Sequence, residues 1–89
     1  MSKKLLVVKV TQEDIDNGTR WDESKCPVAL ALNHIGFPKA RVCSDYWIQS
    51  NEHPHRYLYN PLSYRARKFI QDFDMDKPVE PSTFHLEFE

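Results

Sequence analysis

The stretch VKVTQEDIDNG at residues 8–18 decides the fold, together with CPVALAL at residues 26–32. Residues 5–10 are rich in apolar side chains on both sides of the alternation, which is typical of a central strand covered on at least one face. The polar residues 19–25 then connect this first unit to a second apolar segment. The two stretches therefore predict a strand, a short turn and a buried helix in quick succession.

Residue types that begin and end helices mark both helical units. Thr11 suits the N-cap of a single helical turn, with Asp14 three residues later as an imperfect capping box. We expect Gly18 to supply the left-handed residue that ends this turn. A second helix is expected to begin at Pro27, where a missing N–H costs nothing, and to end before Gly36. Its apolar face is broad, and such a helix is buried on more than one side: Val28, Ala31, Leu32 and Ile35, widened by Ala29 and Leu30.

The middle of the chain predicts extended structure. Apolar and polar residues alternate from Ala40 to Gln49, which is typical of a strand, with a bulge or break at Ser44-Asp45. Residues 51–55 are polar and contain a proline, which favours a turn. Arg56 to Tyr59 predicts a further short strand.

The last third predicts a helix followed by a strand. Asn60-Pro61 has the chemistry of an N-cap and first helical residue. Pro78 and Pro81 indicate an extended linker, and residues 83–88 alternate strictly between apolar and polar. The helix carries an apolar face with helical spacing: Leu62, Ala66, Phe69, Ile70 and Phe73.

The expected order is β-α-β-β-α-β, in one α+β domain that covers residues 1–89. A two-layer sandwich with this order matches the ferredoxin-like split βαβ arrangement. The alternative is another two-layer α+β sheet with the same elements in a different strand order. The sequence does not decide between the two.

Composition excludes several classes of protein. The chain has 89 residues, 40% of them hydrophobic, with a net charge of −1. That size allows one small core, and the near-neutral charge creates no overall field for nucleic acid or membrane. No apolar run approaches the length of a membrane span. The apolar stretch near the N-terminus is too short for an export signal, and the two cysteines are expected to be reduced thiols.

The second half of the chain contains ARKFIQDFD at residues 66–74 and KPVEPSTFHL at residues 77–86. Together with VTQEDIDNG and CPVALAL, these motifs resemble a family of small proteins from tailed bacteriophages. The resemblance covers both ends of the chain and weakens between about residues 37 and 57. It implies a phage origin, and therefore the cytoplasm of an infected bacterium. It implies no catalytic residues, since no activity is established for that family.

Potential metal ligands and nucleophiles do not form a recognised motif, so we expect no metal, no cofactor and no catalytic residues. Cys26 precedes a helix N-terminus, which lowers the pKa of a thiol. A structural N-cap role is nevertheless the better interpretation, because no oxyanion loop accompanies it. No pair has the spacing of a zinc site among Cys26, Cys43, His34, His53, His55 and His85.

Charge along the chain is polarised, and this favours recognition of another protein. Residues 13–25 hold five acidic side chains against two basic ones, whereas residues 56–68 hold four basic side chains and no acid. The predicted acidic contact residues are Glu13, Asp14, Asp16, Asp22 and Glu23. The predicted basic and aromatic contact residues are Arg41, Trp47, Arg56, Tyr64, Arg65, Arg67 and Lys68. Trp21 and Trp47 suit either the core or an interface.

Two functional hypotheses follow. The first is a non-catalytic phage accessory protein that binds and modulates a bacterial protein, with defence components among the candidates. The second is a nucleic-acid-binding module, because ferredoxin-like sheets bind RNA through exposed aromatic side chains. The RNA-binding GFxF signature is absent, and Asp72, Asp74 and Asp76 offset the basic residues of the last helix. The sequence names neither the partner nor the oligomeric state.

Overall fold

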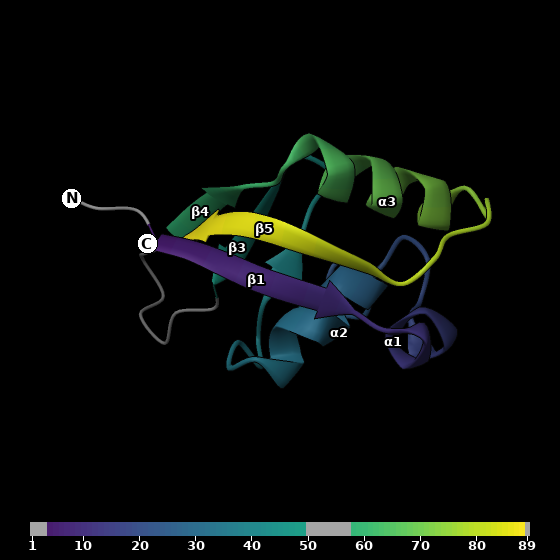
Figure 1. Ribbon diagram of the computed structural model, residues 1–89, viewed down its shortest axis with the longest axis horizontal. Coiled ribbons are helices and arrows are strands. Elements are labelled where there is room, and N and C mark those ends of the chain that lie inside the picture. The colour runs from purple at the N-terminus through teal and green to yellow at the C-terminus, as the bar shows by residue number, and fades with distance from the viewer. Residues whose placement is uncertain (1–3, 50–57, 89) are drawn as a thin grey trace.

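A computed structural model of the chain describes residues 4–49 and 58–88. Three helices and five strands occur within these ranges (Figure 1). In chain order they are β1 (Lys4–Val10), α1 (Gln12–Asn17), α2 (Pro27–His34), β2 (Arg41–Val42), β3 (Tyr46–Gln49), β4 (Leu58–Pro61), α3 (Tyr64–Asp74) and β5 (Ser82–Phe88).

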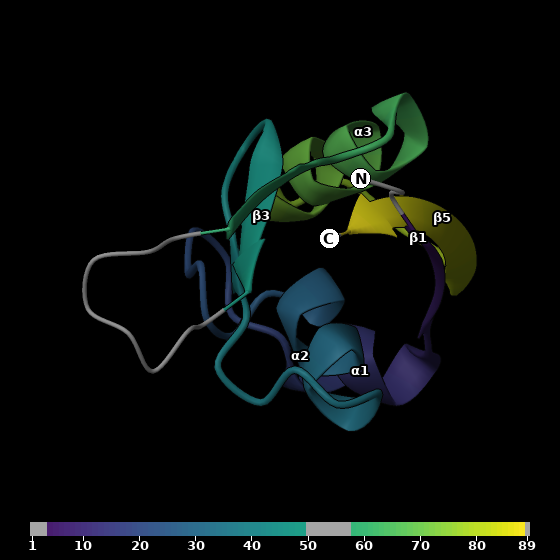
Figure 2. The same ribbon diagram turned by 90° about the vertical axis from the view of Figure 1, so that its left-hand side faces the viewer.

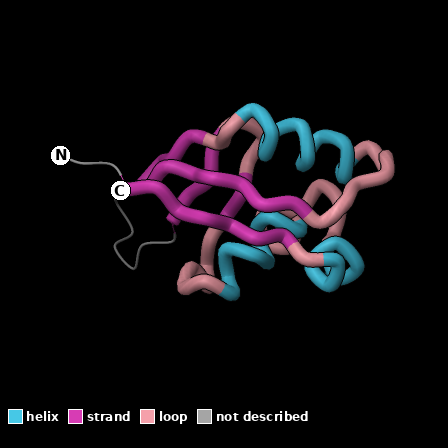
Figure 3. Tube along the Cα trace, viewed as in Figure 1, coloured by secondary structure: helices cyan, strands magenta, loops and turns pink. Residues whose placement is uncertain are grey.

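The described strands form two separate antiparallel sheets. The first and last strands, β1 and β5, pair along their whole length, from Lys4 opposite Phe88 to Val10 opposite Ser82 (Figures 1 and 3). The second sheet has the order β2-β3-β4. The α+β class is thus confirmed. The ferredoxin-like order is not, because that fold needs one continuous sheet.

The separation of the sheets has a local cause between Ala40 and Gln49. We predicted one strand there, with a bulge or break at Ser44-Asp45. The chain in fact reverses at this point, so that β2 folds back on β3, with Val42 opposite Trp47. The break therefore makes a hairpin within what the alternation suggested was a single strand.

The core lies between the two sheets. Viewed along the long axis, β1–β5 and β3 form opposite walls, while α2 and α3 close the other two sides (Figure 2). Phe69 of α3 packs edge-to-face on Phe84 of β5, with ring centroids 5.4 Å apart. Phe37 packs in the same way on Trp47, at 5.2 Å. The predicted apolar faces supply much of this core: Val8, Val10, Val28, Leu32, Ala66, Phe69, Ile70, Phe84 and Leu86 are buried.

The helix caps confirm part of the sequence prediction. Thr11 and Asp14 form a reciprocal capping box, in which each backbone N–H donates to the other side chain. Pro27 is the first residue of α2, and Cys26 caps it by accepting a hydrogen bond from the N–H of Ala29 at 3.4 Å. Gly36 follows the C-cap with φ of 114°, as expected for the residue that ends a helix.

Three local predictions were wrong. Gly18 is extended, with φ of −71°, and its role is to allow close packing: a Cβ there would lie 2.8 Å from the ring of Pro27. Asn60-Pro61 belongs to β4, and Ser63 caps α3 instead. Ile35 is exposed, because α2 ends one residue before it. Residues 56–57 of the predicted short strand lie outside the described ranges.

Candidate functional site

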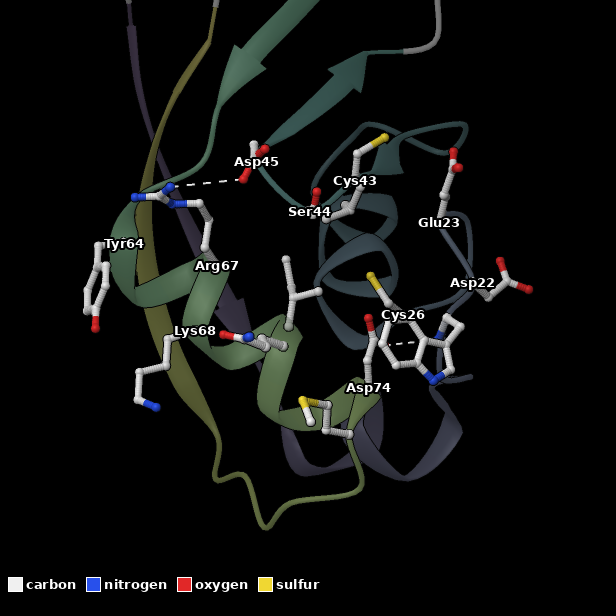
Figure 4. Close-up of a pocket in the computed structure, with 15 residues that line it drawn as sticks. Asp22, Glu23, Cys26, Cys43, Ser44, Asp45, Tyr64, Arg67, Lys68 and Asp74 are labelled. Atoms are coloured by element: carbon white, nitrogen blue, oxygen red, sulfur yellow. Dashed lines mark hydrogen bonds and ion pairs between the residues drawn. The ribbon is translucent and has the colours of Figure 1, made fainter.

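A groove of about 740 Å³ runs along one side of α3. Three segments that are distant in sequence line it. They are the loop at residues 21–26, the turn at residues 42–45 between β2 and β3, and one face of α3. Figure 4 shows Arg67 and Lys68 on the α3 side, with Cys26, Asp22 and Glu23 across the gap.

The wall contributed by α3 extends over the full helix. Tyr64, Arg67, Gln71, Asp74 and Met75 all line the groove, and their spacing of three to four residues places them on one helical face. Eleven residues at 1.5 Å each give this wall a length of about 16 Å. The opposite, buried face of α3 holds Ala66 and Phe69, so the helix is anchored in the core while its groove face remains accessible.

Large apolar side chains stand exposed along the groove. Trp21, Tyr64 and Met75 are 74%, 70% and 54% exposed, respectively. Buried Val42 and Cys26 contribute apolar surface at the base of the groove. Exposed aromatic residues and methionine around an apolar base are characteristic of protein interaction sites.

The loop that carries Trp21 is fastened to the end of α3. Trp21 has a left-handed backbone, with φ of 58°, which is uncommon for a bulky residue. Its N–H donates to Oδ1 of Asp74, and the guanidinium of Arg20 lies 3.0 Å from the carboxylate of Asp76. Figure 4 shows Asp74 reaching across the groove to make this bond. The indole is therefore held in place by its own backbone.

Charged groups at the groove are mostly paired with one another. Arg67 approaches Asp45 at 4.0 Å, at one end of the groove (Figure 4). Asp22 accepts hydrogen bonds from the backbone N–H groups of Ser24 and Lys25, which orders the loop. Exposed pairs of this kind contribute little to stability. Their value is to set a fixed pattern of charge around the apolar surface.

Cys26 is the thiol at the base of the groove. Burial raises its pKa to about 11, although hydrogen bonds from the N–H groups of Ala29 and Val28 act in the opposite direction. The thiol is therefore protonated at neutral pH and is a poor nucleophile. Its geometry supports the structural N-cap role and not the activated thiol that its place before a helix suggested.

The predicted acidic residues divide into two groups. Asp22 and Glu23 line the groove, whereas Glu13 and Asp16 are exposed on α1. Asp14 is buried, which contradicts its assignment to a contact surface. Its Oδ2 accepts from the N–H of Thr11, and its Oδ1 lies 3.2 Å from Nε2 of His34. Asp14 therefore ties α1 to α2.

The predicted basic and aromatic residues also separate. Tyr64, Arg67 and Lys68 line the groove, while Arg65 lines a shallower hollow on another side of α3. Trp47 is 0% exposed and belongs to the core, so its assignment to an interface was wrong. Arg56 lies outside the described residues.

Arg41 does not belong to a basic region separate from the acidic one. Its Nη2 and Nε donate to Oε2 of Glu23, at 2.9 and 3.2 Å. One residue of each predicted group thus pairs with the other. Sequence reasoning missed Met75 and Asp74 as groove residues, because their place at the end of α3 becomes significant only once the Trp21 loop docks there.

The described residues contain no group of three or more histidine, cysteine or acidic side chains placed to hold a metal ion. His53 and His55, the closest pair of candidate ligands in the sequence, lie outside those residues. Within the same part of the chain, no helix has the length and apolarity needed to cross a bilayer. Comparison with protein-family models, curated protein sequences and solved structures finds no match to this chain.

Proposed function

We propose that this protein is a small, non-catalytic accessory protein that binds and modulates a bacterial protein through the groove along α3. One observation carries the proposal: Trp21, Tyr64 and Met75 are all strongly exposed and line the same groove. Tryptophan and tyrosine are enriched among the residues that dominate binding energy at interfaces. An exposed tryptophan otherwise offers a soluble chain no advantage.

The geometry of the Trp21 loop supports a binding role. The bond from Trp21 to Asp74 and the pair Arg20–Asp76 hold the indole before any partner arrives. Ordering an interface side chain in advance reduces the entropy that is lost on association. The charged side chains around the groove then orient the partner and influence the rate of encounter.

The bacterial nature of the partner rests on the resemblance to small phage proteins, which places the chain inside an infected cell. Components of bacterial defence are one class of partner in that setting. The raised pKa of Cys26 supports a non-catalytic role, because the one thiol at the base of the groove is protonated at neutral pH.

A nucleic-acid-binding module is the second candidate. Arg65, Arg67 and Lys68 stand beside exposed Tyr64 on α3, and such a group suits a phosphate backbone and a stacked base. The groove itself argues against this function, since Asp22 and Asp74 line it as well. Carboxylates on that surface would repel phosphate groups.

Capture from bacterial lysate, with and without nuclease, separates the two candidates. The wild-type protein is expected to retain one stoichiometric protein that survives nuclease treatment. Trp21→Ala and Tyr64→Ala should each weaken this capture by about tenfold or more. Ile35→Ala is the matched control, because Ile35 is an exposed apolar residue that does not line the groove.

The same variants define the outcome that contradicts the proposal. Circular dichroism first establishes that each variant is folded. Equal loss of capture in Ile35→Ala would exclude the groove as the docking surface. Salt-sensitive binding to oligonucleotides, without any protein partner, would favour the nucleic-acid module instead.

A further inference from the structure

The strand β1 has one unpaired edge in the described part of the chain. Its other edge pairs with β5 in an uninterrupted one-to-one register over all seven residues. Figures 1 and 3 show β1 as the outer strand of this pair, with β5 between it and α3. The segment Lys4–Val10 contains no proline, glycine or bulge, which are the usual devices that protect a sheet edge.

Apolar side chains on the outer face accompany this open edge. Leu5 and Val7 are 64% and 50% exposed, while Val8 and Val10 on the inner face are buried. Two-stranded sheets are only marginally stable in water, so additional strand pairing is favourable. The edge and the exposed residues together form a surface that suits another β-strand.

We propose that this edge pairs with β1 of a second copy of the same chain. A two-fold axis perpendicular to the sheet makes the two β1 strands antiparallel and keeps the outer faces on one side. Identical side chains then share a face only in registers centred on a single residue, because strand side chains alternate between faces. Every other register would place the inner face of one copy on the outer side.

The register centred on Val7 is the best of these. It pairs all seven residues of β1, whereas registers centred on Leu6 or Val8 pair five. It also places Lys4 opposite Val10 and Lys9 opposite Leu5, so that no lysine faces another lysine. The result is a four-stranded sheet, β5-β1-β1-β5, with Leu5 and Val7 of both copies grouped at its centre.

The proposed dimer leaves the groove free. No residue of β1 lines the groove along α3, so the dimer presents two copies of it. The contact is formed mainly by backbone hydrogen bonds of one strand, which is smaller than a standard interface. We therefore expect a dissociation constant on the order of tens of micromolar.

Sedimentation velocity tests the association. The mass of the wild-type protein should rise with concentration from 10.5 kDa towards twice that value. Val7→Lys should remain monomeric, because two lysines would then face each other at the centre of the contact. His85→Lys is the matched control: His85 lies opposite Val7 on the same face, but on β5, away from the edge. It should dimerise as the wild type does.

Disulfide trapping tests the register independently of any destabilisation. In a Cys43→Ser background, Val7→Cys should cross-link to its own copy under mild oxidation with oxidised glutathione. Residues opposite each other in antiparallel strands have the Cα separation that a disulfide needs. Leu5→Cys should cross-link at least tenfold more slowly, since the two Leu5 positions are about 13 Å apart in this register.

Three results would overturn the dimer. The first is a monomer at every concentration, which also covers the case in which another protein supplies the added strand. The second is an equal loss of association in Val7→Lys and His85→Lys. The third is cross-linking of Leu5→Cys that is as fast as that of Val7→Cys.

Discussion

The backbone N–H of Trp21 donates a 2.9 Å hydrogen bond to Oδ1 of Asp74, which lies 53 residues further along the chain. This contact joins the loop before α2 to the last turn of α3, and it holds an exposed tryptophan in a left-handed conformation. A strained backbone persists only where the surroundings determine it. Here the same contact also builds one side of the groove.

Replacing Trp21 with glycine should separate stability from binding. Glycine adopts a positive φ without a steric penalty, so the free energy of unfolding should be unchanged or increase by about 1 kcal/mol. Partner capture should be lost with the indole. Urea unfolding and the capture assay measure the two quantities. A clear loss of stability would show that the indole packs on the groove and does not project from it.

Asp14 and Asp16 should respond very differently to truncation. Asp14→Ala removes the capping box and the contact with His34, and should lower the free energy of unfolding by about 2 kcal/mol. Asp16→Ala is the control on the same helix, where an exposed carboxylate should change stability by less than about 0.5 kcal/mol. Urea unfolding decides. Equal effects would contradict the structural role of Asp14.

Stability should depend on alkaline pH through Cys26. The folded-state pKa of this thiol is raised from 9.0 to about 11, so ionisation favours the unfolded chain. The contribution is therefore complete below pH 9 and is lost as the pH rises through 11. Over that range it should amount to roughly 2–3 kcal/mol. The measurement is the difference in unfolding free energy between the wild type and Cys26→Ser, which removes effects of other titrating groups.

Labelling of the two thiols offers a check on this account. At pH 8, half-buried Cys43 should react with a thiol reagent faster than Cys26. A faster reaction at Cys26 would indicate a thiolate at neutral pH and would reopen the question of catalysis.

Truncation of Phe69 tests the packing of α3. Phe69 is buried against Phe84, so Phe69→Ala should lower the free energy of unfolding by about 3–5 kcal/mol. Arg65→Ala is the exposed control on the same helix and should have little effect. A loss of less than about 1 kcal/mol in Phe69→Ala would mean that α3 does not pack as described.

Local signals predicted the helices well. Thr11 with Asp14, Cys26 with Pro27, and the apolar spacing around Phe69 each depend on residues within one or two turns. The reversal after Val42 was less visible, because a strand break and a hairpin share the same short polar signal. The separation of the two sheets depends on that reversal and on long-range pairing, and no local pattern records it.

The candidate site was harder to predict for the same reason. Trp21 and Trp47 both stand among polar neighbours in the sequence, yet one is exposed and the other buried. Asp14 and Asp16 differ in the same way, because only Asp14 faces the helix α2. The groove combines residues 21–26, 42–45 and one face of α3, so its existence depends on how three distant segments meet.

The contrast between the two tryptophans has a practical consequence. Trp47 is enclosed by the core and Trp21 stands in solvent at the groove, so each indole senses a different event. Emission from Trp47 follows global unfolding, whereas a soluble quencher reaches Trp21 until a partner shields it. A single fluorescence experiment on the unlabelled chain can therefore monitor folding and groove occupancy together, with Trp21→Phe and Trp47→Phe assigning the two signals.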